Sequence, residues 1–435
     1  MLDNQKMGKF ICEQRKRNHL TQQQLAEELG ITFQAVSKWE NGIVFPNIEI
    51  LPELSRILHV SVDELLKADI SNKESLSYGK AGVDIAYSDS LKRDMAKLLV
   101  SEDARVLNGV GPFASLYDID FEEIEKPTLV LKSEEPGSKQ KLAMEYGYTE
   151  SICHDMVNHL VNDIIVMGAK PLAVLDTIVC GKAEKDTINT FVKGIADACR
   201  ENGCSLVGGE TSIQPQVVQE GTYILSSTVV GIVDKSHVID GSGVEENDVV
   251  LAIESNGLHT NGYSLVRLLM DRCPEIKLER IGGLTFIEQI MKPHLPYYKC
   301  LREFFGKDFC HGMAHITGGG IEGNLCRIIP EGLCAAIDLS QIEVLPVFRF
   351  IKEKGNISDR EMLSTFNCGV GMCVVVPPRH VEKVQSHISR YYHCYPIGAV
   401  KRGAQKVEFC NQLMGINPTT PASKSMIAGT RYFLG

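Results

Sequence analysis

One segment of the sequence places polar side chains along one side of a helix that is otherwise apolar. Apolar residues occupy most of the circumference of the helix predicted after residue 148, which indicates that this helix is buried. Asp155, His159 and Asn162 recur at i, i+4 and i+7 and so form one stripe, with Asn158 and Asp163 beside it. Burying such a stripe of polar side chains is unfavourable unless hydrogen-bonding groups or a bound ligand interact with them. A hydrogen-bond network between helices would supply such interactions, and so would a hydrated Mg²⁺ ion with phosphates, because hard cations take oxygen ligands.

Further carboxylates lie within or after apolar runs that are predicted to be strands. Glu134 follows TLVLKS, Asp176 lies within AVLDTIV, and Glu210 follows SLVGG. Side chains at the ends of strands can converge on one site, although a single acid in such a position is more often part of a turn. Together with the stripe, these acids are candidates for binding a cation.

Glycine-rich turns lie near these acids in the sequence. They are Gly208-Gly209, the two glycines of SNGLHTNG, and Gly318-Gly319-Gly320 in HITGGGIEGN. A glycine run that enters a helix allows backbone N–H groups to approach a phosphate. Each short run is weak evidence alone, and its meaning depends on the longer phrase around it.

The N-terminal segment indicates a different chemistry. Thr21 and Gln24 have the spacing of a capping box that opens a helix, and Gly30 suits the left-handed residue that ends one. A second short helix, FQAVSKWENG, follows after a tight turn. Two short helices in this arrangement, with amide and hydroxyl groups on the outer side of the second, are typical of a helix-turn-helix reader of DNA.

The predicted DNA-contacting face is small, because this segment carries little positive charge. Residues 1–20 have five cationic and two acidic side chains, a net charge of +3, and residues 21–70 have three and eight, a net charge of −5. Dimerisation would double the number of phosphate contacts. We expect the contacting residues to be Arg15, Arg17, Gln22, Gln34, Ser37 and Lys38.

A known family matches this segment. The stretch RKRNHLTQQQLAEELGITFQAVSKWENGIVFPNIEILPELSRILHVSVDELL resembles the Xre/Cro-type helix-turn-helix family, and the SKWENG and FP turns are its most specific parts. The resemblance implies an all-α domain over residues 1–70 that binds double-stranded DNA. A domain that contacts only proteins is the alternative.

The sequence pattern of the rest of the chain is typical of an α/β protein. A polar stretch, 71–77, reads as a linker. From residue 78 onward β-branched runs alternate with helical patterns, and the apolar run 248–253 opens a second half. The fold class expected is therefore multidomain: an all-α helix-turn-helix domain followed by a two-part α/β (α+β) region, with halves over 78–240 and 241–420.

Composition narrows the class of protein further. The chain has 435 residues, of which 44% are hydrophobic and 23% charged, as in globular proteins. Its net charge of −10 excludes a uniformly basic nucleic-acid coat. No apolar run approaches the ~20 residues that cross a bilayer, so we expect no membrane association and a cytoplasmic location. The fourteen cysteines include no CxxC pair and so lack the spacing of a structural zinc site.

Six phrases of the larger region resemble one enzyme family. They are AGVDI, DMVNHLVNDIIVMGAKPLAVLD, GIADACRENGCSLVGGET, SNGLHTNGYSLVR, GMAHITGGGIEGNLCRIIP and EMLSTFNCGVGM. In this order they resemble aminoimidazole ribonucleotide synthetase, also called phosphoribosylformylglycinamidine cyclo-ligase, over roughly residues 78–409. The resemblance implies ATP- and Mg²⁺-dependent ring closure of formylglycinamidine ribonucleotide, a purine-pathway ribonucleotide. It also implies a homodimer whose first halves build a shared barrel of strands.

The resemblance also implies roles for individual residues. The cation of Mg²⁺–ATP would be held by Glu134, Asp163 and Glu210, with Asn162 and Asp176 close by. Lys139 would contact phosphate, and Gly318, Gly319 and Gly320 would lie near a phosphate. The catalytic residues would be His259, Asn261 and His315 in the substrate cleft. For each histidine, a hydrogen-bonded core imidazole is the alternative.

The sequence departs from the family around the expected nucleotide site. Where the family has DGVGTK, this chain has EEPGSK, so Glu135 places a second anion where a polyphosphate would approach. Pro136 stiffens the loop and removes an N–H donor. TSIQP replaces the phrase usual after GGE, and Thr177 replaces a tyrosine. Two functions follow: a cyclo-ligase that carries a DNA-binding domain, or a transcription regulator whose impaired synthetase-like domain senses a purine intermediate or nucleotide.

Overall fold

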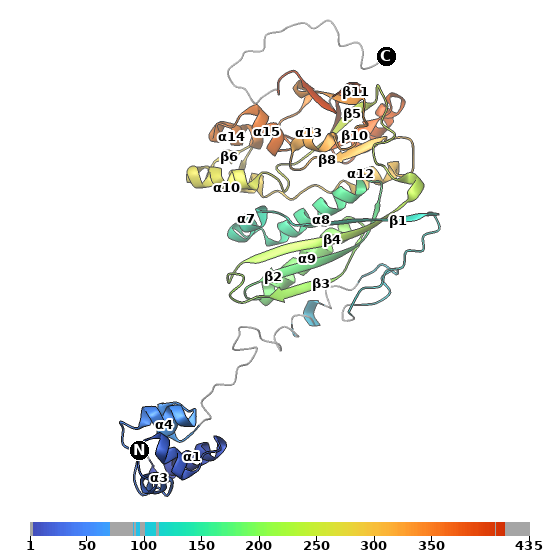
Figure 1. The fold of residues 1–435 in the computed structure, drawn as a ribbon. Helices are drawn as coiled ribbons and strands as arrows, with labels where there is room; N and C mark the ends of the chain where they lie inside the picture. The colour runs from blue at the N-terminus through green and yellow to red at the C-terminus, as the bar shows by residue number, and fades with distance from the viewer. Residues whose placement is uncertain are drawn as a thin grey trace. The chain divides into compact units, whose positions relative to one another are not determined.

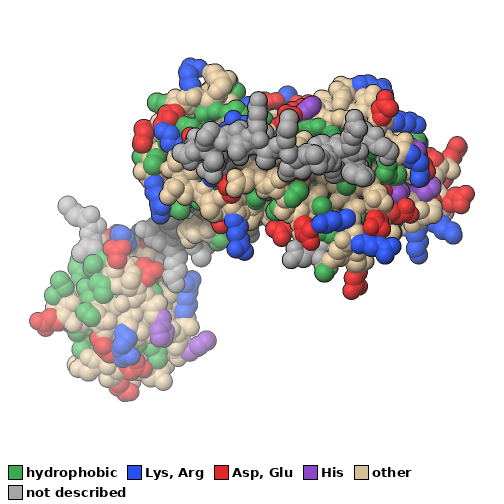
Figure 2. All heavy atoms as spheres, turned by 90° about the horizontal axis from the view of Figure 1, so that it is seen from above, with side chains coloured by type: hydrophobic (Ala, Val, Ile, Leu, Met, Phe, Trp, Pro, Cys, Tyr) green, Lys and Arg blue, Asp and Glu red, His purple; other side chains and the backbone are tan. Residues whose placement is uncertain are grey.

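The computed structural model describes residues 3–69, 90, 93–95, 101–109, 113–404 and 406–413. The chain forms two compact units, residues 1–81 and 82–435 (Figure 1). The predicted linker, 71–77, lies outside the described residues. Among the described residues no helix has the length and apolar character needed to cross a membrane. On the face seen in Figure 2, cationic and acidic side chains are interspersed, and neither sign forms a large area of its own.

The first unit is a bundle of short helices, as the sequence predicts. They are α1 (Asn4–Arg17), α2 (Gln22–Glu28), α3 (Phe33–Glu40), α4 (Leu51–Leu58) and α5 (Val62–Lys67). The capping box at the start of α2 is present, with Thr21 and Gln24 each bonding the other's backbone N–H. The apolar side chains that the helical spacing directs inward make up the core, in which Ile11, Leu25 and Val36 have no exposed surface.

The first half of the second unit is a four-stranded sheet backed by helices. Its strands are β1 (Pro127–Glu134), β2 (Lys170–Cys180), β3 (Ser205–Ile213) and β4 (Tyr223–Asp234), in the order β1-β4-β2-β3. Helix α7 (Lys139–Tyr146) precedes α8 (Thr149–Ile165), and α9 (Lys185–Glu201) follows β2. Helices α8 and α9 pack on each other and on one face of the sheet (Figure 1). The alternating burial along β1 and β2 reflects this one covered face.

The opposite face of this sheet is only partly covered. Phe121 packs against one end of it, in a small core with Leu172, Val207 and Ile232. Farther along, apolar side chains of β1, β2 and β4 project outward with much of their surface exposed: Leu129 50%, Leu131 63%, Leu175 40% and Ile224 40%. Apolar sheet faces of this kind are normally covered by another element or another chain.

The second half is built on a six-stranded sheet. Its strands, in spatial order β12-β9-β11-β5-β10-β8, are β12 (Val407–Cys410), β9 (Leu333–Asp338), β11 (Cys394–Arg402), β5 (Val249–Glu254), β10 (Val370–Val376) and β8 (Gly312–His315). The larger helices of this half are α10 (Tyr263–Arg272), α14 (Pro346–Gly355) and α16 (Val381–Ile388). The shorter ones are α11 (Phe286–Ile290), α12 (Tyr298–Leu301), α13 (Gly320–Leu325) and α15 (Asp359–Thr365). The predicted fold class, an all-α domain followed by a two-part α/β region, is confirmed.

Candidate functional site

The polar stripe on α8 binds the backbone of a segment from the other half. Asn158 Nδ2 donates to the carbonyl of His294 at 2.6 Å, and Asn162 Nδ2 donates to that of Leu295 at 2.9 Å. The Asn162 side-chain oxygen accepts from the N–H of Tyr297. The stripe is therefore mainly a hydrogen-bond network, one of the two explanations left open by the sequence. Its partner is an extended segment, 291–297, rather than a second helix.

Lys139 belongs to the same network and is fully buried. Its Nζ lies 2.7 Å from Asp155 Oδ2 and donates to the carbonyls of His259 (3.0 Å) and Lys292 (2.7 Å). Burial lowers the pKa of Lys139 and raises that of Asp155 to about 6, in each case against the attraction between the pair. With its three donors taken up, Lys139 joins the two halves here. This differs from the phosphate contact that the family resemblance implies.

Two of the three predicted cation ligands meet across a lysine. Lys132 Nζ lies 3.1 Å from Glu134 Oε2 and 3.1 Å from Asp163 Oδ2. Burial would raise the pKa of Asp163, but a hydrogen bond from His315 and the nearby positive charges hold it well below its usual range. The two carboxylates are thus placed to share one cation, and in this structure the ammonium group of Lys132 fills that position.

Glu210 does not join the other two carboxylates, which corrects the expected set of three within one chain. The β1-β4-β2-β3 order places Glu134 and Glu210 three strand spacings apart, about 14 Å. Glu210 pairs with Thr177, one residue beyond the Asp176–Gly209 pair. Because successive side chains alternate in direction, Glu210 projects from the partly covered face, whereas Asp176 faces the helices.

Asp176 is buried in the core of the first half rather than beside the carboxylates. Its side chain is 3% exposed, and its Oδ2 has no hydrogen-bond partner among the described residues. Gly209 gives it room, because a Cβ on that glycine would lie 2.0 Å from Asp176 Oδ1. Burial raises the pKa of Asp176 to about 7. A buried acid whose pKa is raised to about 7 is a weak candidate for contacting a nucleotide.

Asp176→Asn should stabilise the protein increasingly as the pH rises. The folded state holds a proton up to about pH 7, whereas the unfolded chain releases it near pH 3.9. The wild-type protein therefore loses stability between these values, at about 1.4 kcal/mol per pH unit, and asparagine does not. Urea unfolding at pH 5 and pH 8 checks this, with the exposed Asp120→Asn as control. A difference between variant and wild type that does not change with pH would contradict it.

A small cleft lies where loops of the two halves approach each other. Its volume is about 340 Å³. The lining includes Ser138 of the EEPGSK loop, Asn261 and Glu361. A Cβ on Gly318 would lie 3.3 Å from Asn261 Oδ1, so the triple-glycine turn is beside the same asparagine. The structure thus brings together Asn261, the glycine turn and the loop after β1.

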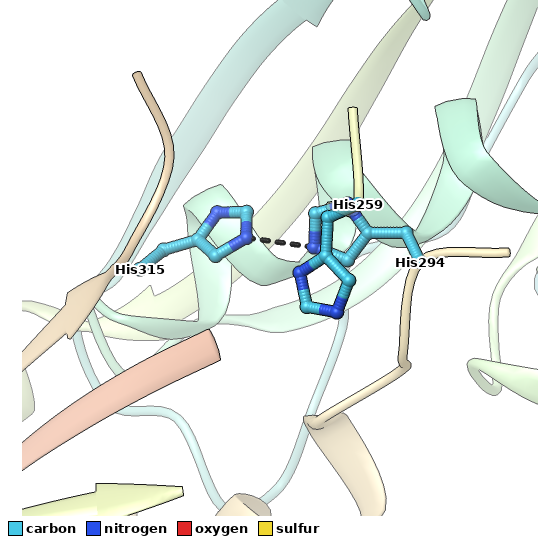
Figure 3. Close-up of side chains that lie close together, drawn as sticks. All are labelled: His259, His294 and His315. Atoms are coloured by element: carbon cyan, nitrogen blue, oxygen red, sulfur yellow. Dashed lines mark hydrogen bonds between the residues drawn. The ribbon is translucent and has the colours of Figure 1, made fainter. Parts of the chain in front are cut away.

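The predicted catalytic histidines lie beneath this region, in a buried group of imidazoles (Figure 3). His259 is 1% exposed and His315 is 5% exposed. His315 Nδ1 donates to Asp163 Oδ1 at 2.7 Å, while the ring of His259 stacks on that of His294 with centroids 3.9 Å apart. Burial lowers the pKa of His259 and of His294 well below the usual value, so these rings are neutral. His315 therefore fits its core alternative, a hydrogen-bonded imidazole, whereas both ring nitrogens of His259 lack hydrogen-bond partners among the residues that the structure describes.

The predicted DNA-contacting set is only partly on the surface. Arg15 is buried, with Nε and Nη2 donating to the carboxylate of Glu40 at 2.6 and 2.9 Å, and Gln22 Nε2 donates to the same carboxylate at 2.7 Å. The structure therefore corrects the expectation for Arg15, which is an internal clamp between α1 and α3. The other members differ in exposure: Arg17, Gln34 and Lys38 are exposed, and Ser37 is half-buried.

Sequence reasoning did not single out two residues of this region. Lys132 lies two residues before Glu134 on the same side of β1. In a strand this spacing predicts that the two side chains are neighbours. His294 lies in the phrase KPHLP, between two prolines, where only the fold reveals its neighbours.

Family models match three parts of the chain. Residues 13–65 match a helix-turn-helix model, residues 124–233 the N-terminal domain of AIR synthase related proteins, and residues 245–410 their C-terminal domain. The fold and the matches together define the class: a two-part AIR synthase-related region preceded by a helix-turn-helix domain.

Curated relatives identify the family within this class. The phosphoribosylformylglycinamidine cyclo-ligase of Methylobacillus flagellatus is 42% identical over 322 residues, which cover 73% of this chain and 92% of the relative. That of Burkholderia multivorans is 40% identical over 319 residues, covering 73% and 90%. The chain belongs to the phosphoribosylformylglycinamidine cyclo-ligase family.

Solved structures with lower identity share the fold. E. coli HypE has a TM-score of 0.55 at 14% identity, covering 74% of this chain and 94% of that one. Thiamine-monophosphate kinase from Stenotrophomonas maltophilia has a TM-score of 0.53 at 17% identity, covering 75% and 96%. HypE solved in complex with ATP has a TM-score of 0.53 at 16% identity, covering 74% and 90%.

Proposed function

We propose that the second unit catalyses ATP-dependent closure of formylglycinamidine ribonucleotide to aminoimidazole ribonucleotide, and that the first unit binds double-stranded DNA. The observation that carries the enzymatic part is the 42% identity to a cyclo-ligase over 92% of that protein's length. The cleft beside Asn261 and the triple-glycine turn supports it, because loop backbone at a helix start suits phosphate.

The chemistry divides between activation and ring closure. An amide oxygen is a poor leaving group, so ATP first phosphorylates it to an iminophosphate. An internal nitrogen then attacks the same carbon, closes the five-membered ring and expels phosphate. The protein must hold the two reacting atoms together and neutralise phosphate charge, so we expect positioning and electrostatics to dominate. Asn261 lines the cleft, and the triple-glycine turn lies beside that asparagine, so these are the groups that we expect to serve this purpose.

Mg²⁺ fits two of the three residues expected to hold it. Glu134 and Asp163 already share the cation of Lys132, so a divalent ion can be held between the same carboxylates once the ammonium group moves aside. Such an ion would screen the phosphate charge of ATP. Glu210, on the other face of the sheet, is not part of this pair.

A matched pair of substitutions tests the nucleotide site. Calorimetric titration of Mg²⁺–ATP should show weaker binding for Glu134→Gln, which removes a cation ligand. It should show tighter binding for Glu135→Gln, because Glu135 is exposed and sets a charge against the polyphosphate without pairing to Lys132. Equal effects of the two substitutions would contradict the assignment of Glu134.

A nucleotide or purine-intermediate sensor is the second candidate function. Lys132 between the two carboxylates, and Glu135 beside them, favour it, since both oppose the binding of a metal–polyphosphate complex. In that case the ligand must bind two conformations of the protein with different affinity, or no signal reaches the DNA. Saturable ligand binding that shifts DNA affinity, without turnover, would select the sensor.

Double substitution of Gln34 and Ser37 by alanine should weaken specific DNA binding and leave the ring-closing rate unchanged. Gln34 is exposed on α3, the second helix of the pair, where an amide can contact a base edge. Loss of about 1–3 kcal/mol per base contact corresponds to a decrease of tenfold or more in affinity. Fluorescence anisotropy on an operator fragment measures it. A parallel fall in the ring-closing rate would contradict the division between the units.

The partly covered sheet face supports a homodimer formed through the first half. Leu131 is 63% exposed at the centre of the apolar face of β1 and β4, opposite Val230. Leu131→Lys places a charge on this face and should convert the dimer to monomers at micromolar concentration, as measured by analytical ultracentrifugation. Leu278→Lys, at a leucine elsewhere in the unit that is 80% exposed, is the control. A wild-type protein that is already a monomer would contradict the proposal.

A further inference from the structure

Four histidines from distant parts of the chain form one buried cluster. They are His159 on α8, His259 after β5, His294 in the segment 291–297, and His315 at the end of β8. Their exposed fractions are 7%, 1%, 1% and 5%. The His294 and His315 ring centroids are 4.9 Å apart. Figure 3 shows His315 directed toward His294, on which His259 stacks.

The hydrogen bonds of the cluster bring ring nitrogens of different histidines close together. The carboxylate of Asp163 accepts from His315 Nδ1, which in a neutral ring leaves a lone pair on Nε2, and this Nε2 atom lies 2.9 Å from His294 Nε2. Within the part of the chain that the structure describes, neither nitrogen of His259 has a hydrogen-bond partner, and neither does Nδ1 of His294. Burying each of these three ring nitrogens without a hydrogen bond costs about 1–3 kcal/mol of folding free energy.

The backbone holds these rings in place independently of their own contacts. Lys139 Nζ donates to the carbonyl of His259, and Asp155 accepts from the N–H of His294. His315 is paired with Met372 in the sheet. His259 has a left-handed backbone, with φ of 59°, a costly conformation for a residue other than glycine. The cluster is thus built by the same network that joins the two halves.

We propose that His259, His294 and His315 bind one transition-metal ion, for which Zn²⁺ is the best fit. One ligand nitrogen from each lies within 4.8 Å of the others. A tetrahedral zinc ion with bonds of about 2.0–2.1 Å requires nitrogens about 3.4 Å apart. Binding the ion therefore requires the Nε2 atoms of His294 and His315, 2.9 Å apart, to separate by about half an ångström, while no pair of the three ligand nitrogens is more than 4.8 Å apart.

The surroundings match those of known metal-binding histidines. Such histidines usually donate their second ring N–H to a carboxylate, as His315 does to Asp163. Neutral imidazoles without a carboxylate among the direct ligands select zinc, cobalt, nickel or copper over Mg²⁺. Three protein ligands leave a fourth position open. The proposal is independent of ring closure, because the site can bind metal whether or not the second unit turns over substrate.

Metal titration of the full-length protein tests the proposal. Protein freed of metal by a chelator is titrated with Zn²⁺ against a chromophoric competitor, and separately with Co²⁺, whose visible spectrum reports tetrahedral geometry. We expect one ion per chain and a tetrahedral cobalt spectrum without thiolate charge-transfer bands. His294→Gln should lose at least 100-fold in affinity. Asp163→Asn should lose about 10–100-fold.

The controls separate a lost ligand from a lost fold. His154→Gln alters another histidine of α8, paired with Glu201 outside the cluster, and should bind Zn²⁺ as the wild type does. Circular dichroism checks that each variant is folded, and if His294→Gln does not fold, Asp163→Asn decides alone. The proposal is overturned by any of three results: no stoichiometric binding to the wild type, unchanged affinity in the folded variants, or thiolate bands in the cobalt spectrum.

Discussion

Lys139→Met is expected to destabilise the second unit by about 3–5 kcal/mol, because it leaves the buried carboxylate of Asp155 without its cation. The loss extends beyond the ion pair, since Lys139 also donates to two carbonyls of the other half. Urea unfolding followed by circular dichroism measures it. A fall of this size is a large fraction of the stability of an ordinary domain.

Two companion variants show whether the buried charge is the cause. Lys139→Met combined with Asp155→Asn removes both charges and should recover part of the loss. Lys193→Met breaks an exposed ion pair with Asp197 and should leave the unfolding curve unchanged. If Lys139→Met instead left stability unchanged and raised the KM for ATP, the lysine would contact phosphate, as the family resemblance implies.

Arg15→Ala is expected to abolish DNA binding by unfolding the first unit rather than by removing a DNA contact. It leaves Glu40 buried without its bidentate partner, which costs about 3 kcal/mol, the lower end of the range for buried pairs. Trp39 reports on this unit alone, because it is the only tryptophan of the chain and is 4% exposed. The thermal transition that Trp39 fluorescence reports should therefore occur at a lower temperature in Arg15→Ala. The transition temperature of the second unit should stay unchanged.

The pair also gives this unit a defined response to acid. Burial by itself would raise the pKa of Glu40, but hydrogen bonds from Arg15 and Gln22 outweigh it and hold that pKa below its usual range. The stabilisation is therefore present above about pH 4.3 and is lost as the pH falls through the lower folded value. Arg56→Ala, in an exposed pair with Glu53, is the control for Arg15→Ala. Unchanged Trp39 unfolding in Arg15→Ala, with DNA binding lost, would restore Arg15 as a contact residue.

Local patterns were sufficient to predict the first unit. The capping box of Thr21 and Gln24 and the inward spacing of Val36 and Trp39 depend on neighbours within one or two turns. The burial of Arg15 was not predictable from local patterns, because its partner, Glu40, is 25 residues away. From the sequence alone, a cationic residue near a predicted DNA-contacting helix is interpreted as a phosphate contact. Only the fold shows that a carboxylate pairs with it instead.

The candidate site of the second unit shows the same limit. The stripe on α8 and its burial were evident from helical spacing, but its partners are carbonyls of the segment 291–297, which sequence spacing does not reveal. The separation of Glu134 from Glu210 follows from the strand order, which places two strands between them. The four histidines of the cluster lie between 21 and 156 positions apart, and the sequence contains no local pattern for the cluster.

We propose that this chain combines a DNA-binding unit with a unit that catalyses ATP-dependent ring closure, and single-turnover kinetics test the ring closure most directly. The purified protein is mixed with Mg²⁺–ATP and formylglycinamidine ribonucleotide, and ADP and aminoimidazole ribonucleotide are quantified, with Glu134→Gln as control. We expect ADP and aminoimidazole ribonucleotide to form in equal amounts, only when substrate is present, and to be strongly reduced in the variant. Saturable binding of either ligand without ADP release would contradict the proposed ring closure and favour the sensor instead.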